Sequence, residues 1–233
     1  MEHAMLWTAA MTQGYAVAGT DGRLGTVIDL LFDDASWTMR WLVVRTGDWF
    51  PNHDVLLPVS AVGQLDPVRR EFRVALTVQQ IRDSPRIERD LPVSRQEEAG
   101  SPLRRAAVGR LAGYAVLSAS GANDPHLRSM EAVLGHLVHA DDGLIGHVDD
   151  FLVDDAAWSI RFIKIDTRDW GPARRVSLSP RLVRRIDWLA RAVHLHVDRR
   201  AIESRSLSGP ALEAGAVDGE LLLACKDIRW SSE

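Results

Sequence analysis

Several side chains of this 233-residue chain could do chemistry, and the first question is whether any of them form a complete site. His194 and His196 share one face of an expected strand and could hold zinc, but a catalytic zinc site needs a further protein ligand that is not evident. The paired carboxylates Asp33-Asp34 and Asp154-Asp155 could attract a divalent cation, although a calcium site needs about six to eight oxygens. Aspartate also favours the first position of type I turns. We therefore expect surface histidines, turn aspartates and no metal site.

The sequence gives little support to enzymatic chemistry. Serine, histidine and aspartate are all present, but the chain has no Gly-x-Ser-x-Gly nucleophile elbow, no P-loop and no dinucleotide-binding fingerprint. Cys225 is the single cysteine, so neither an intramolecular disulfide nor a cysteine metal cluster is possible. We expect no catalytic residue, no cofactor and no enzyme. An uncharacterised metal-dependent hydrolase is the weakest alternative that we consider.

Arginines gather in the second half of the chain, where residues 168–185 contain six of them. The candidates for a binding patch are Arg174, Arg175, Arg181, Arg184 and Arg185. Such a patch would attract phosphate, an anionic lipid or an acidic partner. The alternative is an ordinary solvated surface, because arginine is by far the commoner basic residue of this chain and its net charge is −4. Only clustering in space would make these residues a site.

Apolar side chains form a second candidate surface, in the first half of the chain. Alternation along an expected strand turns Leu42 and Val44 inward and the residues between them outward. The outward and following apolar residues are Trp41, Val43, Trp49 and Phe50. Contiguous exposed apolar patches often mark interfaces. The open alternative is that the linker or the other half of the chain covers them.

The segments that must position these residues occur twice in the sequence. Residues 21–49 match residues 142–170 without a gap, at an offset of 121, with 14 identities in 29 positions. Average residue usage would give roughly two identities by chance. The chain is therefore an internal duplication, with a first repeat at 5–85 and a second repeat at 126–206. What the repeats share is more readily explained by fold than by chemistry.

Each repeat has the pattern of an all-β unit, with short apolar runs separated by Asp-Gly, Asp-Asp and proline. A symmetric hairpin around the turn at 33–36 would place Asp29 opposite Arg40, and the second repeat would place Asp150 opposite Arg161. Opposed charges across a strand pair contribute roughly 0.2–1 kcal/mol. We therefore predict a structural clasp in both repeats. A slip of one residue would break it.

The segments outside the repeats are expected to differ in structure. The linker at 86–125 is predicted to be partly helical, with the run from Leu103 to Leu117 as its amphipathic helix. The tail at 207–233 has no counterpart in the duplication. Thr77 and Gln80 have the spacing of a capping box before a short helix, and Asp198 is the matching cap of the second repeat.

The repeated motif resembles the PRC-barrel family. Its parts are Asp-Gly, then Gly-x-Val, then Asp-Asp-x-x-Trp, followed by an apolar strand and a short Val-x-Leu element at Val55–Leu57 and Val176–Leu178. That family includes the cytoplasmic barrel of the photosynthetic reaction-centre H subunit and the C-terminal barrel of the ribosome-maturation factor RimM. The resemblance implies a mainly β chain with two small antiparallel barrels and no family-wide catalytic residues. It also implies an adaptor or assembly role.

These observations favour a non-enzymatic bacterial adaptor that mediates protein–protein interaction. Neither a signal peptide nor a transmembrane stretch is visible, so we expect a cytoplasmic protein. The resemblance to the reaction-centre subunit implies that it could attach peripherally to a complex at the inner membrane. The partner is a protein of unknown identity, and a homodimer is one form considered. The alternative is an RNA- or ribosome-assembly-associated factor that uses the arginine patch.

Overall fold

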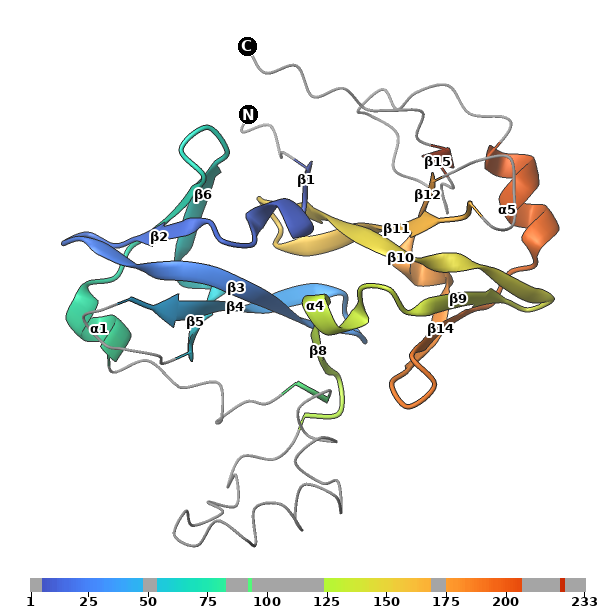
Figure 1. Ribbon diagram of the computed structural model, residues 1–233, viewed down its shortest axis with the longest axis horizontal. Helices are drawn as coiled ribbons and strands as arrows, with labels where there is room; N and C mark the ends of the chain where they lie inside the picture. The colour runs from blue at the N-terminus through green and yellow to red at the C-terminus, as the bar shows by residue number, and fades with distance from the viewer. Residues whose placement is uncertain are drawn as a thin grey trace, which may run out of the picture. The chain divides into compact units, whose positions relative to one another are not determined.

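The computed structural model describes residues 6–47, 54–82, 92–93, 124–168, 175–206 and 223–224. The chain is mainly β, as the sequence predicts, and it divides into two compact units (Figure 1). Unit 1 comprises residues 1–5, 9–132 and 155–159, and unit 2 comprises residues 6–8, 133–154 and 160–233. These units do not follow the linear boundaries of the repeats, because each unit contains a segment of the other repeat.

Unit 1 is built on two long strands that form a hairpin. Its strands are β2 (Ala16–Ala18), β3 (Arg23–Asp33), β4 (Thr38–Thr46), β5 (Asp54–Pro58), β6 (Val62–Asp66), β7 (Glu71–Val74) and β8 (Leu127–Ser129). Its helices are η1 (Ala10–Thr12), η2 (Val59–Ala61), α1 (Val78–Arg82) and α4 (Met130–Val133). The strand order is β4-β3-β2-β7-β6, with β5 beside β4 and β8 beside β3.

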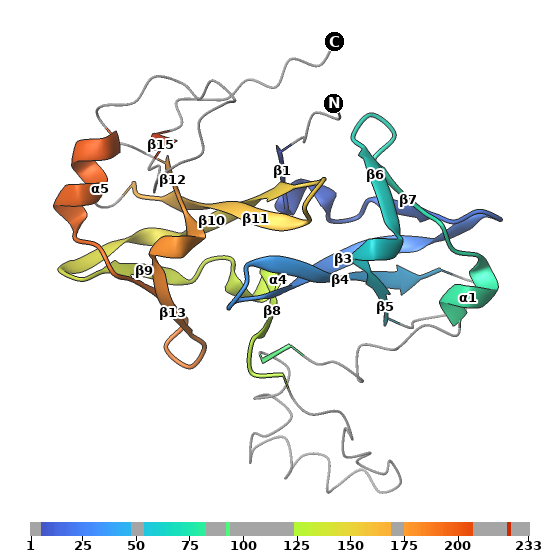
Figure 2. The ribbon, with the colours of Figure 1, turned by 180° about the vertical axis from the view of Figure 1, so that it is seen from behind.

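Unit 2 repeats this plan. Its strands are β1 (Leu6–Thr8), β9 (Leu137–Ala140), β10 (Gly143–Asp154), β11 (Ser159–Asp166), β12 (Arg175–Leu178), β13 (Val183–Asp187), β14 (Ala192–Leu195) and β15 (Leu223–Ala224). Its helices are η4 (Pro180–Leu182) and α5 (Arg199–Ser206). The strand order is β13-β14-β9-β10-β11, with β1 beside β10 and β12 between β11 and β15. Figure 2 shows the β13 side of this unit from behind.

The strand pairings do not show the two closed barrels that the sequence predicts. Among the described residues neither strand order closes on itself. The sheets are also mixed rather than purely antiparallel, since β2 pairs with β7 and β9 with β14 in parallel. Closed barrels therefore remain a prediction. The predicted linker helix at 103–117 lies outside the described residues.

The repeated sequence signals have local physical causes. Trp37 and Trp158 both adopt a positive φ, of 57° and 47°, where the Asp-Asp-x-x-Trp turn closes. Gly25 and Gly146 are also equivalent, and a Cβ at either would approach a backbone oxygen of the neighbouring strand to 2.2 or 1.9 Å. Side chains cannot occupy that space, so glycine at this position is a packing requirement.

The predicted helix caps are confirmed in both repeats. The backbone N–H of Thr77 donates to Gln80 Oε1 at 2.9 Å, and the N–H of Gln80 donates to Thr77 Oγ1 at 3.2 Å. This reciprocal pair is the capping box that precedes α1. In the second repeat the N–H of Ala201 donates to Asp198 Oδ1 at 2.7 Å.

Each unit is completed by a strand of the other repeat. The N-terminal strand of the second repeat, β8, pairs antiparallel with β3, with Leu127 opposite Asp33. The N-terminal strand of the first repeat, β1, pairs antiparallel with β10, with Leu6 opposite Asp154. The two registers differ by 121 residues on both strands, so they are the same contact made twice. The two repeats therefore exchange their N-terminal strands within the chain.

Candidate functional site

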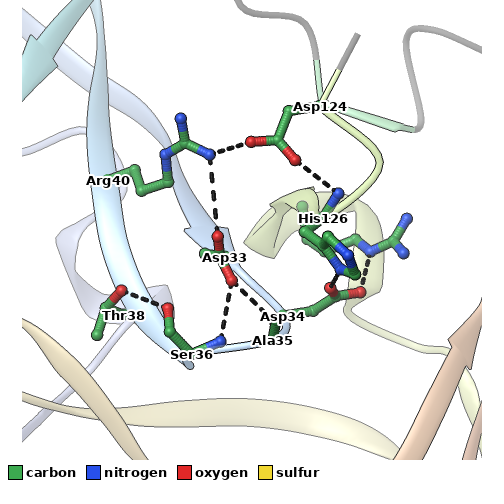
Figure 3. A network of polar contacts seen from close by, with 9 residues as sticks. Asp33, Asp34, Ala35, Ser36, Thr38, Arg40, Asp124 and His126 are labelled. Carbon is green, nitrogen blue, oxygen red and sulfur yellow. Dashed lines mark hydrogen bonds and ion pairs between the residues drawn. The ribbon is translucent and has the colours of Figure 1, made fainter.

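The acidic turn of the first repeat holds the exchanged strand (Figure 3). Asp33 Oδ1 accepts hydrogen bonds from the N–H groups of Ala35 and Ser36, both at 2.9 Å, which is the turn role expected of aspartate. Asp34 instead reaches the second repeat. His126 Nδ1 lies 2.8 Å from Asp34 Oδ1, and Arg128 Nε donates to Asp34 Oδ2.

Two further contacts fix the chain that enters β8. Arg40 Nη1 donates to Asp124 Oδ2 and lies 3.9 Å from Asp33 Oδ2. The backbone N–H of His126 and then Arg40 stabilise the ionised Asp124 carboxyl, which lowers its pKa. The N–H of Asp34 donates to the carbonyl oxygen of His126 at 3.0 Å. The acidic turn and Arg40 therefore form a set of polar anchors for the incoming segment.

Asp29 is a third anchor for that segment. Its Oδ2 accepts from Ser129 Oγ at 2.6 Å, and its Oδ1 accepts from the N–H groups of Leu30 and Glu131 at 2.8 and 3.1 Å. Burial raises the pKa of the Asp29 carboxyl, and the three hydrogen bonds lower it. Burial is the larger effect, so the pKa is about 6. The segment is thus held in part by a carboxyl group whose charge is costly to bury.

The predicted clasp between Asp29 and Arg40 is wrong, because β3 and β4 carry two irregularities in register. They place Asp29 opposite Val43, and Arg40 falls at the second irregularity, next to the acidic turn. In the second repeat Arg161 Nε lies 4.0 Å from Asp154 Oδ2, while Asp150 Oδ1 accepts from the N–H of Phe151 at 2.7 Å. Arg40 and Arg161 thus contact equivalent aspartates, Asp33 and Asp154.

The described part of the predicted apolar surface is Trp41 and Val43, and Val43 is buried. Val43 forms a buried cluster with Leu31, Leu56 and Leu127, each with no exposed surface, and Trp41 packs against it. Leu127 belongs to the second repeat, so the alternative that the other half of the chain covers this face is correct for Val43. Trp49 and Phe50 lie outside the described residues. The outward face of β4 is therefore the seat of the exchanged strand.

The predicted arginine patch is largely neutralised by aspartates. Arg181 is exposed, and Arg174 lies outside the described residues. The other three each form an ion pair within unit 2. These pairs are Arg175–Asp149, Arg184–Asp141 and Arg185–Asp187, with N···O distances of 3.2, 2.9 and 2.6 Å. Each pair removes positive charge from the surface, which weakens the attraction for a polyanion.

Unit 2 has a different surface, of which only His194 and Arg185 were predicted from the sequence. Leu137 and Leu144 are 45% and 41% exposed, whereas Val138 between Leu137 and His139 is fully buried. Leu144 lies opposite His139 in the β9–β10 pair, and His139 lies opposite His194 in the β9–β14 pair. We call this surface the leucine–histidine face, defined by Leu137, His139, Leu144, His194 and Arg185.

The two histidines of this face stack on each other. Their ring centroids are 5.5 Å apart and their planes differ by 21°. Arg185 Nη2 lies 3.4 Å from His194 Nε2. Burial, then the charge of Arg185 and then His139 lower the pKa of His194, which favours the neutral imidazole. Among the described residues no three histidine, cysteine or acidic side chains gather as metal ligands would.

Sequence reasoning selected His194 but paired it with His196 on one expected strand, whereas β14 ends at Leu195. The neighbour of His194 in space is His139, on a strand more than fifty residues earlier. The period of two in a strand at 137–140, which places Leu137 and His139 on one face, was the signal that could have found this face. The parallel pairing of β9 with β14 could not be predicted from that alternation.

Comparison with known families identifies the first repeat. Residues 13–80 match the model of the PRC-barrel domain, so the chain contains a PRC-barrel domain in its first repeat. The match covers 68 of the 233 residues. No curated protein matches the chain. In the part of the chain that the structure describes, no helix has both the length and the apolar character needed to cross a membrane.

Proposed function

We propose that this chain is a non-enzymatic adaptor or assembly protein that binds another protein through the leucine–histidine face of unit 2. The observation that supports it best is the exposure of Leu137 and Leu144 on strands whose other apolar residues are buried. Two exposed leucines beside a stacked imidazole pair form an apolar centre, with Arg185 at its edge. Interfaces commonly have such an apolar centre and a polar rim.

The comparison between the repeats supports the same proposal. At the positions equivalent to Leu137, His139 and Leu144 the first repeat has Ala16, Ala18 and Arg23. Both repeats must satisfy the same strand pairings, so the leucines and the histidine are not requirements of the fold. A partner that contacts unit 2 accounts for exposed leucines at these equivalent positions in one repeat only.

The second repeat is proposed to form a PRC-barrel unit like the first, and the resemblance to the reaction-centre H subunit suggests where the adaptor acts. We place its partner in a complex at the cytoplasmic face of the inner membrane, to which the chain attaches peripherally. The leucine–histidine face would supply that protein contact, so no membrane-spanning element of this chain is required.

The experiment is sedimentation of a native lysate, with the chain followed across soluble, ribosomal and membrane fractions at low and moderate salt. The test variant is Leu137→Ser with Leu144→Ser, and the matched control carries Ala16→Ser with Arg23→Ser at the equivalent positions. We expect the wild type and the control to co-sediment with a membrane complex and the test variant to move to the soluble fraction. Identical distributions of both variants would contradict the proposal.

A further inference from the structure

The exchange of strands between the repeats has a consequence for how the chain associates with itself. We propose that the edge of β3 also accepts the N-terminal segment of the second repeat from another copy of the chain, so that two chains associate by exchanging their second repeats. This goes beyond the proposed adaptor role and does not involve the leucine–histidine face.

The contact has the form of a two-fold interface. Leu127–Ser129 on β3 and Leu6–Thr8 on β10 use equivalent positions in the same register. A contact made twice by equivalent residues is what two identical subunits form around a two-fold axis. Nothing in either strand pairing requires that the two repeats belong to one chain.

The second repeat brings all the docking groups with it. The segment at 124–132 supplies the partners of Arg40, Asp34 and Asp29. The turn at 155–159 adds Trp158, whose carbonyl accepts from the N–H of Met39 at 2.7 Å. Between Arg82 and Asp124 the chain has 41 residues, and none of the contacts named here involves them. A second copy can therefore present the same ligand.

The seat on unit 1 is selective for this ligand. Asp34 pairs with Arg128 and His126 of the second repeat. Arg40 pairs with Asp124 of the second repeat. The first repeat has Trp7, Met5 and His3 at the positions equivalent to Arg128, His126 and Asp124. It therefore offers Asp34 no arginine and Arg40 no carboxylate. The occupant of the β3 edge is therefore the second repeat, from the same chain or from another copy.

Concentration decides between the two sources. A tethered segment commonly has an effective concentration of about 1 mM, so the chain closes on itself when dilute. Exchange competes when chains refold together at comparable concentration or are gathered on one partner. Once formed, the exchanged pair is closed, because each chain fills the seat of the other.

Charge reversal separates the two sources. One variant carries Asp34→Arg, which reverses the seat, and the other carries Arg128→Asp, which reverses the ligand. In each variant alone the intrachain contact pairs like charges. In a mixture both contacts are restored only between chains, so we expect a one-to-one dimer after co-refolding, measured by light scattering and native mass spectrometry. The matched control has both substitutions in one chain, restores the contact internally and should remain a monomer.

Two results would overturn the proposal. One is a mixture that yields no mixed dimer although the doubly substituted control folds as a monomer. If that control does not fold, the test uses wild-type chain prepared with heavy and with light isotope labels. Refolding such a mixture at about millimolar concentration, near the effective concentration of the tether, should give mixed-label dimers. Monomers alone under those conditions would exclude exchange.

Discussion

Replacement of Asp29 by asparagine should stabilise the protein at neutral pH, although it removes a hydrogen-bonded carboxylate. Burial raises the pKa of Asp29 from 3.8 to about 6. Folding therefore favours the protonated acid, and the stability contributed by this group is fully present below pH 3.8. It is lost as the pH rises through about 6. A shift of that size corresponds to about 3 kcal/mol.

Asparagine reproduces the protonated state in shape. Its oxygen can accept from the N–H groups of Leu30 and Glu131, and its amide can donate to Ser129 Oγ. We therefore expect Asp29→Asn to unfold with a free energy about 1–3 kcal/mol higher than the wild type at pH 7.5, with the difference shrinking towards pH 4. Ser129→Ala should raise the pKa of Asp29 further, since that hydroxyl stabilises the carboxylate.

Urea unfolding of both proteins between pH 4 and 8 measures the effect, because the difference between their curves cancels the other titrating groups. Carboxyl carbon NMR of Asp29 gives its pKa independently. The reasoning is refuted if Asp29→Asn destabilises the chain at pH 7.5 while the pKa of Asp29 is near 4. In that case the hydrogen bonds from Ser129 and Glu131 outweigh burial.

Other predictions address the packing. Leu127→Ala should lower the free energy of unfolding by about 2–5 kcal/mol, because it leaves a cavity in the buried cluster. Val68→Ala, at a side chain that is 91% exposed, is its control and should change little. Gly25→Ala should cost about 1–3 kcal/mol, because the new Cβ would meet the Arg45 carbonyl oxygen at 2.2 Å. Gly47→Ala, with nothing within 4 Å, should be nearly neutral. Thermal or urea unfolding of the four variants checks both comparisons.

The sequence predicted those features that depend on local chemistry. The mainly β class followed from short apolar runs between turn residues, and the capping box at Thr77 and Gln80 followed from their spacing. The clasp of Asp29 with Arg40 failed because a symmetric hairpin was assumed, and the two irregularities between β3 and β4 shift the register. Bulges are set by tertiary pairing, which the alternation of a single strand does not encode.

The candidate surfaces failed for a related reason. Alternation correctly indicated that Val43 faces away from Leu42 and Val44, but it cannot say what covers an outward face. Leu127 covers it, from a strand 84 residues further along the chain. The arginines were grouped by position in sequence, whereas Arg175 and Arg184 pair with aspartates from a distant part of the chain, Asp149 and Asp141. Long-range pairing thus decided both outcomes.

Site-specific photo-crosslinking in cells tests the central claim, which is that the leucine–histidine face binds a partner protein. A benzophenone side chain is placed at Leu144 in one version of the chain and at the equivalent Arg23 in the other. We expect a discrete crosslinked protein adduct from position 144 that position 23 does not give. Equal crosslinking from both positions, or none from position 144 in cells where the chain is expressed, would contradict it.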